Sequence, residues 1–224
     1  MQALHYLGNA LGPAQLRWQD VPDAALVNPG DALVRPLAVA ACDLDRSIVD
    51  GNAPFKPPFV LGHEFTGEVI ARGEQVTAID VGDIVLASFQ PSCGACEPCK
   101  RGHTAACAAV APTSMYGIGE AAGVWSGAFA DAVRVPWADF NLRRLPANVT
   151  PIDARLRLPN VSAPIVCRWT IGHGDSRHTT SRWIAPSAPK ALRRYFAPPR
   201  RSACAPAHRS TSGRIRRCRL ATCT

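Results

Sequence analysis

Short apolar or alternating stretches, separated by glycine and proline turns, run through the first two thirds of the chain. Residues 32–40 (ALVRPLAVA) follow a Pro-Gly-Asp turn and predict a strand, and Pro36 places that strand near a sheet edge or a bulge. The same reasoning predicts strands at residues 3–6, 16–18, 68–71 and 128–135. Residues 43–50 predict a short helix. Many short strands with such turns are typical of a mainly β, barrel-like domain.

The net charge of +8 is divided unevenly along the 224 residues. Residues 1–154 carry 10 Lys and Arg against 16 Asp and Glu, whereas residues 155–224 carry 15 against 1. The basic character therefore belongs to the tail. The sequence contains no run of 18 apolar residues and no basic segment followed by an apolar core at its start, so we expect a cytoplasmic protein without a membrane span.

Four of the nine cysteines lie within fifteen residues, at Cys93, Cys96, Cys99 and Cys107. With turns at Gly94, Pro98 and Gly102, this spacing brings four thiolates into one loop, as a closed tetrahedral zinc site requires. Such clustering favours a metal in a reducing compartment over a disulfide framework. An iron–sulfur cluster is the alternative, but its last gap is usually three residues, with a proline after the last cysteine. Here the gap is seven and Ala108 follows, so we predict a structural zinc that holds a lobe together without doing chemistry.

Two further stretches contain candidate metal ligands. His63 and Glu64 lie between Gly62 and Gly67, and glycine allows the backbone to approach a neighbour or a ligand closely. Cys42 lies two residues after the end of the predicted strand 32–40. Thiolate and neutral imidazole are suitable zinc ligands, and a catalytic zinc site needs three protein ligands and one open position. The alternative for Cys42 is a buried, small apolar side chain.

These motifs resemble those of the zinc-dependent medium-chain alcohol dehydrogenases over about residues 1–154. The residues that carry the resemblance are Gly62, His63, Glu64, Gly67, Gly73 and Val76, together with the four-cysteine run. The resemblance implies a GroES-like catalytic domain in which Cys42 and His63 bind a catalytic zinc and Glu64 is either a ligand or a close neighbour. It also implies that Asp45 accepts a hydrogen bond from His63. The implied substrate is a small alcohol, aldehyde or ketone, and the implied cofactor is NAD(P).

The chain departs from this family at several positions. Leu44 stands where many members have a Ser or Thr that passes the substrate proton, and Ser47 stands where many have a histidine. A bound water is the expected substitute. The family commonly takes its third zinc ligand from a helix after residue 154, but Pro159 would break that helix here. Cys167 is the remaining candidate, although its surroundings match nothing in the family. Trp125 either lines the substrate cleft or packs in the core.

Residues 155–224 hold 14 arginines and show no sustained helical or strand period, which predicts disorder. The expected cofactor domain, with its glycine fingerprint, does not appear in them. An out-of-frame reading of the gene explains the abrupt end of the resemblance, and the rival explanation is a basic arm that binds nucleic acid. We therefore expect a fragment resembling a zinc-dependent alcohol dehydrogenase that is inactive by itself. The alternative is a zinc-stapled binding module with a nucleic-acid-binding tail.

Overall fold

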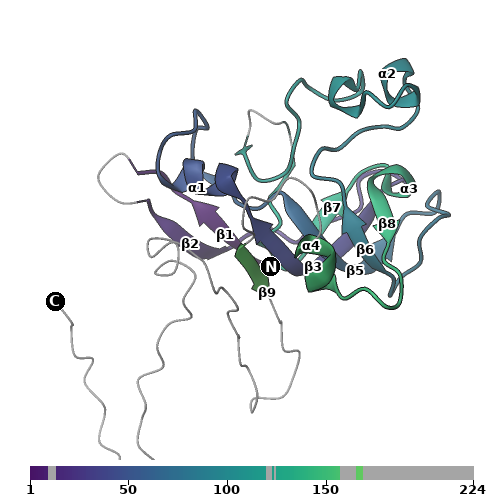
Figure 1. The fold of residues 1–224 in the computed structure, drawn as a ribbon, viewed down its shortest axis with the longest axis horizontal. Coiled ribbons are helices and arrows are strands. Elements are labelled where there is room, and N and C mark those ends of the chain that lie inside the picture. Colours follow the sequence, from purple (N-terminus) through teal and green to yellow (C-terminus); the bar gives the residue numbers. More distant parts are fainter. Residues whose placement is uncertain (10–13, 120–122, 124, 157–164, 169–224) are drawn as a thin grey trace, which may run out of the picture.

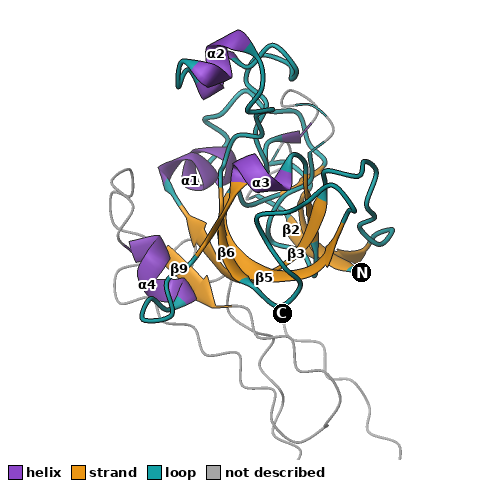
Figure 2. Ribbon diagram, turned by 90° about the vertical axis from the view of Figure 1, so that its right-hand side faces the viewer, coloured by secondary structure: helices purple, strands orange, loops and turns teal. Residues whose placement is uncertain are grey.

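The computed structural model describes residues 1–9, 14–119, 123, 125–156 and 165–168, which form two antiparallel sheets. One sheet has the order β2-β1-β4, and the other has the order β7-β3-β5-β6-β8 with β9 also paired to β3. Figure 1 shows the elements, and Figure 2 shows the strands curving around a common interior. The strands are β1 Gln2–Tyr6, β2 Leu16–Asp20, β3 Ala32–Ala41, β4 Phe59–Val60, β5 Glu64–Arg72, β6 Ile84–Ala87, β7 Val133–Val135, β8 Leu142–Arg144 and β9 Ile165–Arg168. The prediction of a mainly β fold is confirmed.

Strands β3 and β5 form the central pair, and their register determines which chain segments meet. Ala40 pairs with Glu64 at one end and Ala32 pairs with Arg72 at the other. The register shifts between Pro36 and Ala38, because proline has no amide hydrogen to give to the ladder. The predicted irregularity at Pro36 is thereby confirmed. This register places the residue after β3 beside the residue before β5.

The core lies between the sheets and is filled mainly by β-branched and aromatic side chains. Val34 and Val69 are fully buried on the central pair. Phe65 and Tyr116 are also fully buried, and their rings meet edge to face with centroids 5.7 Å apart. Burial of one such side chain stabilises the fold by about 1.5–3 kcal/mol relative to leaving it in water. This packing makes the β3–β5 pair a rigid support for the residues at its end.

The helices are short. They are α1 Asp43–Val49, α2 Glu97–Lys100, the 3-10 turn η1 Thr104–Ala106, α3 Ala138–Asn141 and α4 Pro151–Leu156. The predicted helix after β3 is confirmed by α1. Helix α4 begins where the Thr150 hydroxyl accepts a hydrogen bond from the Asp153 amide, a normal N-cap contact. Its first carbonyl, on Pro151, accepts a hydrogen bond from the Thr66 hydroxyl of β5, which fixes α4 against the central sheet.

Two segments differ from the sequence expectation. The predicted strand over residues 128–135 is regular only at β7, because the amides of Ala128 and Phe129 bind the carbonyls of Gly62 and Leu61 outside any continuous ladder. In the tail, the four residues of β9 pair with Ala38 to Ala41 of β3, where no strand was expected. The β-prone sequence Ile-Val-Cys-Arg suits this edge position. The other tail residues beyond Leu156, which include most of the 14 arginines of residues 155–224, lie outside the described residues.

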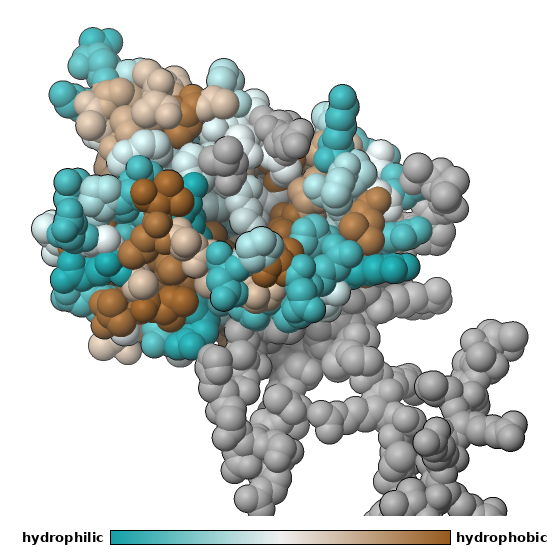
Figure 3. All heavy atoms as spheres, turned by 180° about the vertical axis from the view of Figure 1, so that it is seen from behind, coloured by the Kyte–Doolittle hydropathy of each residue, from teal (hydrophilic) through white to brown (hydrophobic). Residues whose placement is uncertain are grey.

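The molecular surface combines apolar areas with charged ones. The exposed large apolar side chains of the described residues are Trp18, Leu26, Val27, Ile70, Val81 and Phe89. Figure 3 shows one face, on which hydrophobic side chains gather in a band bordered by hydrophilic ones. In the part of the chain that the structure describes, no helix is both long and apolar enough to cross a bilayer.

Candidate metal centres

Cys42 lies between β3 and α1 and is the N-cap residue of that helix. Its Sγ accepts a hydrogen bond from the Leu44 amide at 3.3 Å. In return, Oδ2 of Asp45 accepts a hydrogen bond from the Cys42 amide at 2.9 Å, which completes a capping box.

His63 approaches Cys42 from the turn before β5. Gly62 makes this approach possible, because its φ is +95° and a Cβ there would lie 2.8 Å from the Phe129 ring. The Nε2 atom of His63 lies 3.0 Å from the Cys42 Sγ. The Nδ1 atom faces Oδ1 of Asp45 at 3.5 Å, and both side chains are 3% exposed. The imidazole therefore lies between a thiol on one edge and a carboxylate on the other.

The contact between His63 and Asp45 is unusual because it is deeply buried. Neither His63 Nδ1 nor Asp45 Oδ1 has a hydrogen-bond partner at this distance, although buried polar atoms are nearly always paired. Burial works to lower the pKa of His63, but the Asp45 carboxylate and the contact with Cys42 outweigh it and raise the pKa to about 9. A cation bound by Sγ and Nε2 would instead favour the neutral imidazole, which keeps its one proton on Nδ1, facing Asp45. The donor set thus fits a metal ion.

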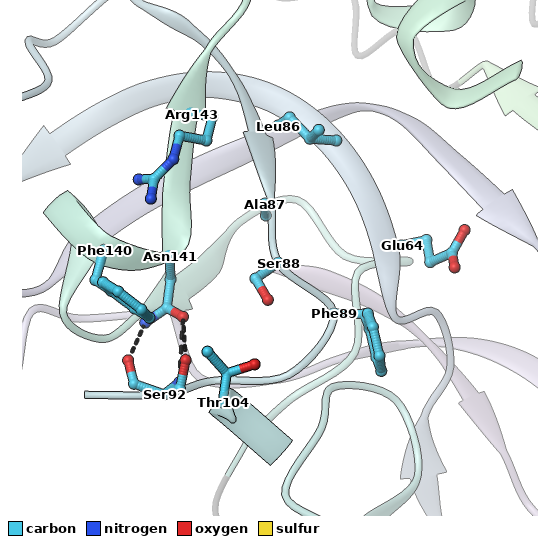
Figure 4. Close-up of a pocket in the computed structure, with 10 residues that line it drawn as sticks. All are labelled: Glu64, Leu86, Ala87, Ser88, Phe89, Ser92, Thr104, Phe140, Asn141 and Arg143. Carbon is cyan, nitrogen blue, oxygen red and sulfur yellow. Dashed lines mark hydrogen bonds between the residues drawn. The ribbon is translucent and has the colours of Figure 1, made fainter. Parts of the chain in front are cut away.

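The structure brings together three of the four predicted residues of this site. The donor atoms of Cys42, Asp45 and His63 all lie within 4.8 Å of one another. Glu64 follows His63 on β5 and lines a neighbouring pocket of about 350 Å³ instead. Figure 4 shows its side chain at the edge of that pocket, which lies between the barrel and the four-cysteine segment.

The other residues that the sequence singled out near this site are placed as follows. The Leu44 side chain packs against the hydrophobic core, and Ser47 is half-buried on α1. Trp125 also packs against the core, with the Arg134 guanidinium 5.1 Å from its ring centroid and the Trp137 ring 6.4 Å away. These contacts support the interpretation that Trp125 packs against the core. The side chain of Cys167 is outside the described part of the structure.

The second group of metal-binding side chains comes from residues 93–107, which we call the cysteine lobe. It contains α2 and η1 and lies away from the strands in Figures 1 and 2. The sulfurs of Cys93, Cys96, Cys99 and Cys107 all lie within 4.8 Å of one another. Gly94 and Gly102 turn the chain with φ of +71° and +81°, a region that glycine adopts without strain. The lobe thereby closes around a single centre.

Backbone amides inside the cysteine lobe point at the sulfurs. The Cys93 amide donates to the Cys107 Sγ at 3.3 Å, and the Cys96 amide donates to the Cys93 Sγ at 3.4 Å. Hydrogen bonds from the amides of Ala108 and Cys99 lower the pKa of Cys96 to about 6, while burial raises the pKa of Cys99 to about 12. Four sulfur donors gathered around one centre fit a closed tetrahedral zinc site with no position left for substrate.

One residue next to the cysteine lobe was missed in the sequence. The buried side chain of Asn141, at the end of α3, makes hydrogen bonds to Ser92, the residue before Cys93. The sequence offers no clear signal, since Asn141 is one of several polar residues in the stretch Trp137 to Pro146.

Comparison with known proteins agrees with this geometry. Residues 28–146 match the family model of the alcohol dehydrogenase GroES-like domain, which covers more than half of the chain. The chain is 36% identical over 145 residues to a glutathione-independent formaldehyde dehydrogenase of Pseudomonas aeruginosa, covering 61% of this chain and 36% of that protein. It is 34% identical over 151 residues to a protein of Mycobacterium tuberculosis named as a probable zinc-binding alcohol dehydrogenase, covering 67% of this chain and 38% of that protein.

A solved structure gives the same result for the fold. The alcohol dehydrogenase of Thermus sp. ATN1 superposes with a TM-score of 0.60 at 35% identity, and the match covers 67% of this chain and 42% of that one. The chain therefore spans about two fifths, or slightly less, of the length of these relatives. The matched segment contains both candidate metal centres. From these matches, we conclude that the chain belongs to the alcohol dehydrogenase GroES-like domain family.

Proposed function

We propose that residues 1–154 form the zinc-carrying catalytic domain of a zinc-dependent alcohol dehydrogenase, which interconverts a small alcohol with its aldehyde or ketone using NAD(P). The observation that carries this proposal is the meeting of the Cys42 thiol and the His63 imidazole at 3.0 Å, with a buried carboxylate behind the imidazole. The relatives named as dehydrogenases support the same conclusion.

Each residue of the site would have a separate task. Cys42 and His63 would hold the zinc ion, which would supply a Lewis acid for the substrate oxygen. Asp45 would keep the proton of His63 on Nδ1, so that the Nε2 lone pair stays directed at the Cys42 side of the ring. Glu64 is the proposed third ligand or close neighbour, and because its side chain lines the neighbouring pocket it would have to turn toward Cys42 and His63 to bind the ion. Because the Leu44 side chain can neither donate nor accept a proton, the proton released from an alcohol would pass to water.

The cofactor part of this proposal rests on the relatives alone. None of the described residues forms the strand, glycine turn and helix that bind a dinucleotide, so we assign no residue of this chain to NAD(P). The cysteine lobe has a structural task in the proposal, which is to bind a second zinc ion and order residues 93–107.

A spectroscopic test does not depend on turnover. The chain is loaded with cobalt in place of zinc, and imidazole or benzyl alcohol is added while the visible absorption is recorded. An open position at the Cys42 and His63 site predicts a spectral shift, and Cys42→Ser should remove the shift while leaving the absorption of the lobe. If neither probe changes the spectrum, or if the shift persists in Cys42→Ser, the proposed catalytic metal site is wrong.

A further inference from the structure

The cysteine lobe is joined to the barrel by a short connection. Residues 88–92 run from the end of β6 to Cys93, the first thiol of the lobe. A metal site that is built from one loop still needs its first ligand to be presented in a fixed direction. The side chains that hold this connection are therefore part of the metal site, although they bind no metal themselves.

Asn141 holds the far end of the connection. Its Nδ2 donates to the Ser92 carbonyl at 2.8 Å, and its Oδ1 accepts a hydrogen bond from the Ser92 amide at 3.1 Å. Figure 4 shows these contacts as dashed lines beside the pocket. The Asn141 side-chain amide thus pairs with both the backbone N–H and the backbone C=O of Ser92, as a neighbouring strand would. The Ser92 hydroxyl adds a longer contact to Oδ1 at 3.4 Å.

The orientation of the Asn141 amide is fixed by its other contacts. Nδ2 also donates to the Pro136 carbonyl at 2.8 Å and approaches the Trp137 carbonyl at 3.4 Å. If the amide were turned over, its oxygen would face these carbonyls, and three acceptors would meet without a proton between them. The side chain is buried, so water cannot replace the lost hydrogen bonds.

The same residue also fixes the near end of the connection. The backbone carbonyl of Asn141 accepts a hydrogen bond from the Ser88 amide at 2.9 Å. Its neighbour Phe140 packs against Gly94 so closely that a Cβ on Gly94 would lie 2.5 Å from the ring. Residues 140 and 141 therefore contact the connection at both ends and the lobe just after its first thiol.

We propose that Asn141 is a positioning residue for the metal site of the cysteine lobe, because its amide holds Ser92 so that Cys93 points toward the other three thiols. This inference rests on the proposed structural zinc. It adds to that site a residue that binds no metal and lies 34 positions beyond Cys107, the last cysteine of the lobe. Losing the amide should leave the barrel folded and loosen the hold on the metal.

The test measures zinc release from the full 224-residue chain to the chelator 4-(2-pyridylazo)resorcinol, in a Cys42→Ser background so that only the zinc of the lobe is counted. Asn141→Leu keeps the size of the side chain and removes its side-chain hydrogen bonds, while the backbone bond to Ser88 remains, and we expect zinc release to be at least about tenfold faster. Ser92→Ala keeps both backbone groups of Ser92, so its release rate should stay within about twofold. Asn148→Leu, at an exposed position seven residues on, is the matched control and should change nothing.

Hydrogen exchange at the Ser92 amide gives a second measurement. In Asn141→Leu this amide should lose protection while the amides of β5 and β6 keep theirs. A folded Asn141→Leu chain with the parent release rate would overturn the proposal, and so would a Ser92→Ala chain that releases zinc equally fast. If Asn141→Leu does not fold, Asn141→Asp is judged by the same standard, and failure of both to fold would show that Asn141 supports the whole barrel instead.

A failure of the zinc assignment itself would look different. If the parent chain holds no zinc in its lobe, the proposed structural zinc is wrong. Hydrogen exchange at the Ser92 amide in Asn141→Leu would then still show whether the Asn141 side chain holds Ser92 in place.

Discussion

The cysteine lobe and the Cys42–His63 site both gather metal-binding side chains, but the chain assembles them in opposite ways. All four sulfurs of the lobe come from one stretch of fifteen residues, and amides of the same loop point at them. Cys42 and His63 are 21 positions apart and meet only because β3 and β5 pair in one register. The lobe is therefore organised locally, whereas the other site is organised by the sheet.

This difference indicates what each site needs in order to form. The lobe has few apolar side chains to pack, and α2 and η1 are each a single turn, so a bound metal should be its main source of order. The Cys42–His63 site stands on two strands whose inward-facing side chains are buried, and it should keep its shape without metal. The following predictions test this contrast, from the largest expected effect to the smallest.

The largest effect is expected from the loss of one lobe thiol. Cys93→Ser should lower the free energy of unfolding by at least about 3 kcal/mol, because zinc bound to a structural site contributes directly to folding. Cys42→Ser should cost about 1 kcal/mol or less, since serine is itself a good N-cap for α1. Denaturant unfolding of both variants measures the two values, and equal losses would contradict the contrast.

A smaller effect is expected when the carboxylate behind His63 is neutralised. Asp45→Asn should weaken zinc binding at the Cys42–His63 site by about 10- to 100-fold, because the imidazole loses the partner that orients it. Zinc in the cysteine lobe should be unaffected. Competition with a chelator measures both sites, and Asp43→Asn, on the exposed side of α1, is the matched control. Equal weakening in the control would mean that net charge, not orientation, is responsible.

A glycine pair tests how closely the lobe is packed on the barrel. Gly94→Ala should cost about 2–3 kcal/mol, because the residue has φ of +71° and its Cβ would meet the Phe140 ring. Gly82→Ala shares the positive φ but has open space around it, so it should cost only about 1 kcal/mol. Thermal unfolding of the two variants gives the difference, and no difference would mean that the lobe moves freely over Phe140.

The smallest effect is expected at a contact that involves neither group of metal-binding side chains. The amides of Thr77 and Ala78 donate to the Asp139 carboxylate, and although burial works to raise its pKa, these hydrogen bonds lower it. Asp139→Ala should cost roughly 1 kcal/mol while both zinc ions stay bound. A lowered pKa means that this stabilisation is present above about pH 4 and is lost as the pH falls further. Thermal unfolding together with zinc analysis checks the variant, and loss of either metal would contradict it.

The parts that the sequence predicts well are those whose evidence is local. The spacing of the cysteines predicts the lobe, and the alternation in residues 32–40 predicts β3 with its irregularity at Pro36. The helix after β3 also follows from its own residues. In each case, propensity and spacing within one stretch decide the structure.

The parts that it misses depend on contacts between distant residues. Asn141 and Ser92 are 49 positions apart, so no local pattern connects them. The contact of Asp45 with His63 was expected from the family resemblance alone, because no local pattern connects these two residues. The pairing of β9 with β3 depends on a free sheet edge, which is a property of the fold and not of the tail sequence.

The most direct test of the account is the zinc content of the purified chain and of two single variants, measured by mass spectrometry of the metal. Two metal centres predict two zinc ions per chain, one remaining in the lobe of Cys42→Ser, and loss of the lobe zinc in Cys93→Ser. A chain that holds one zinc ion, with the same content in Cys42→Ser, would contradict the proposed catalytic site.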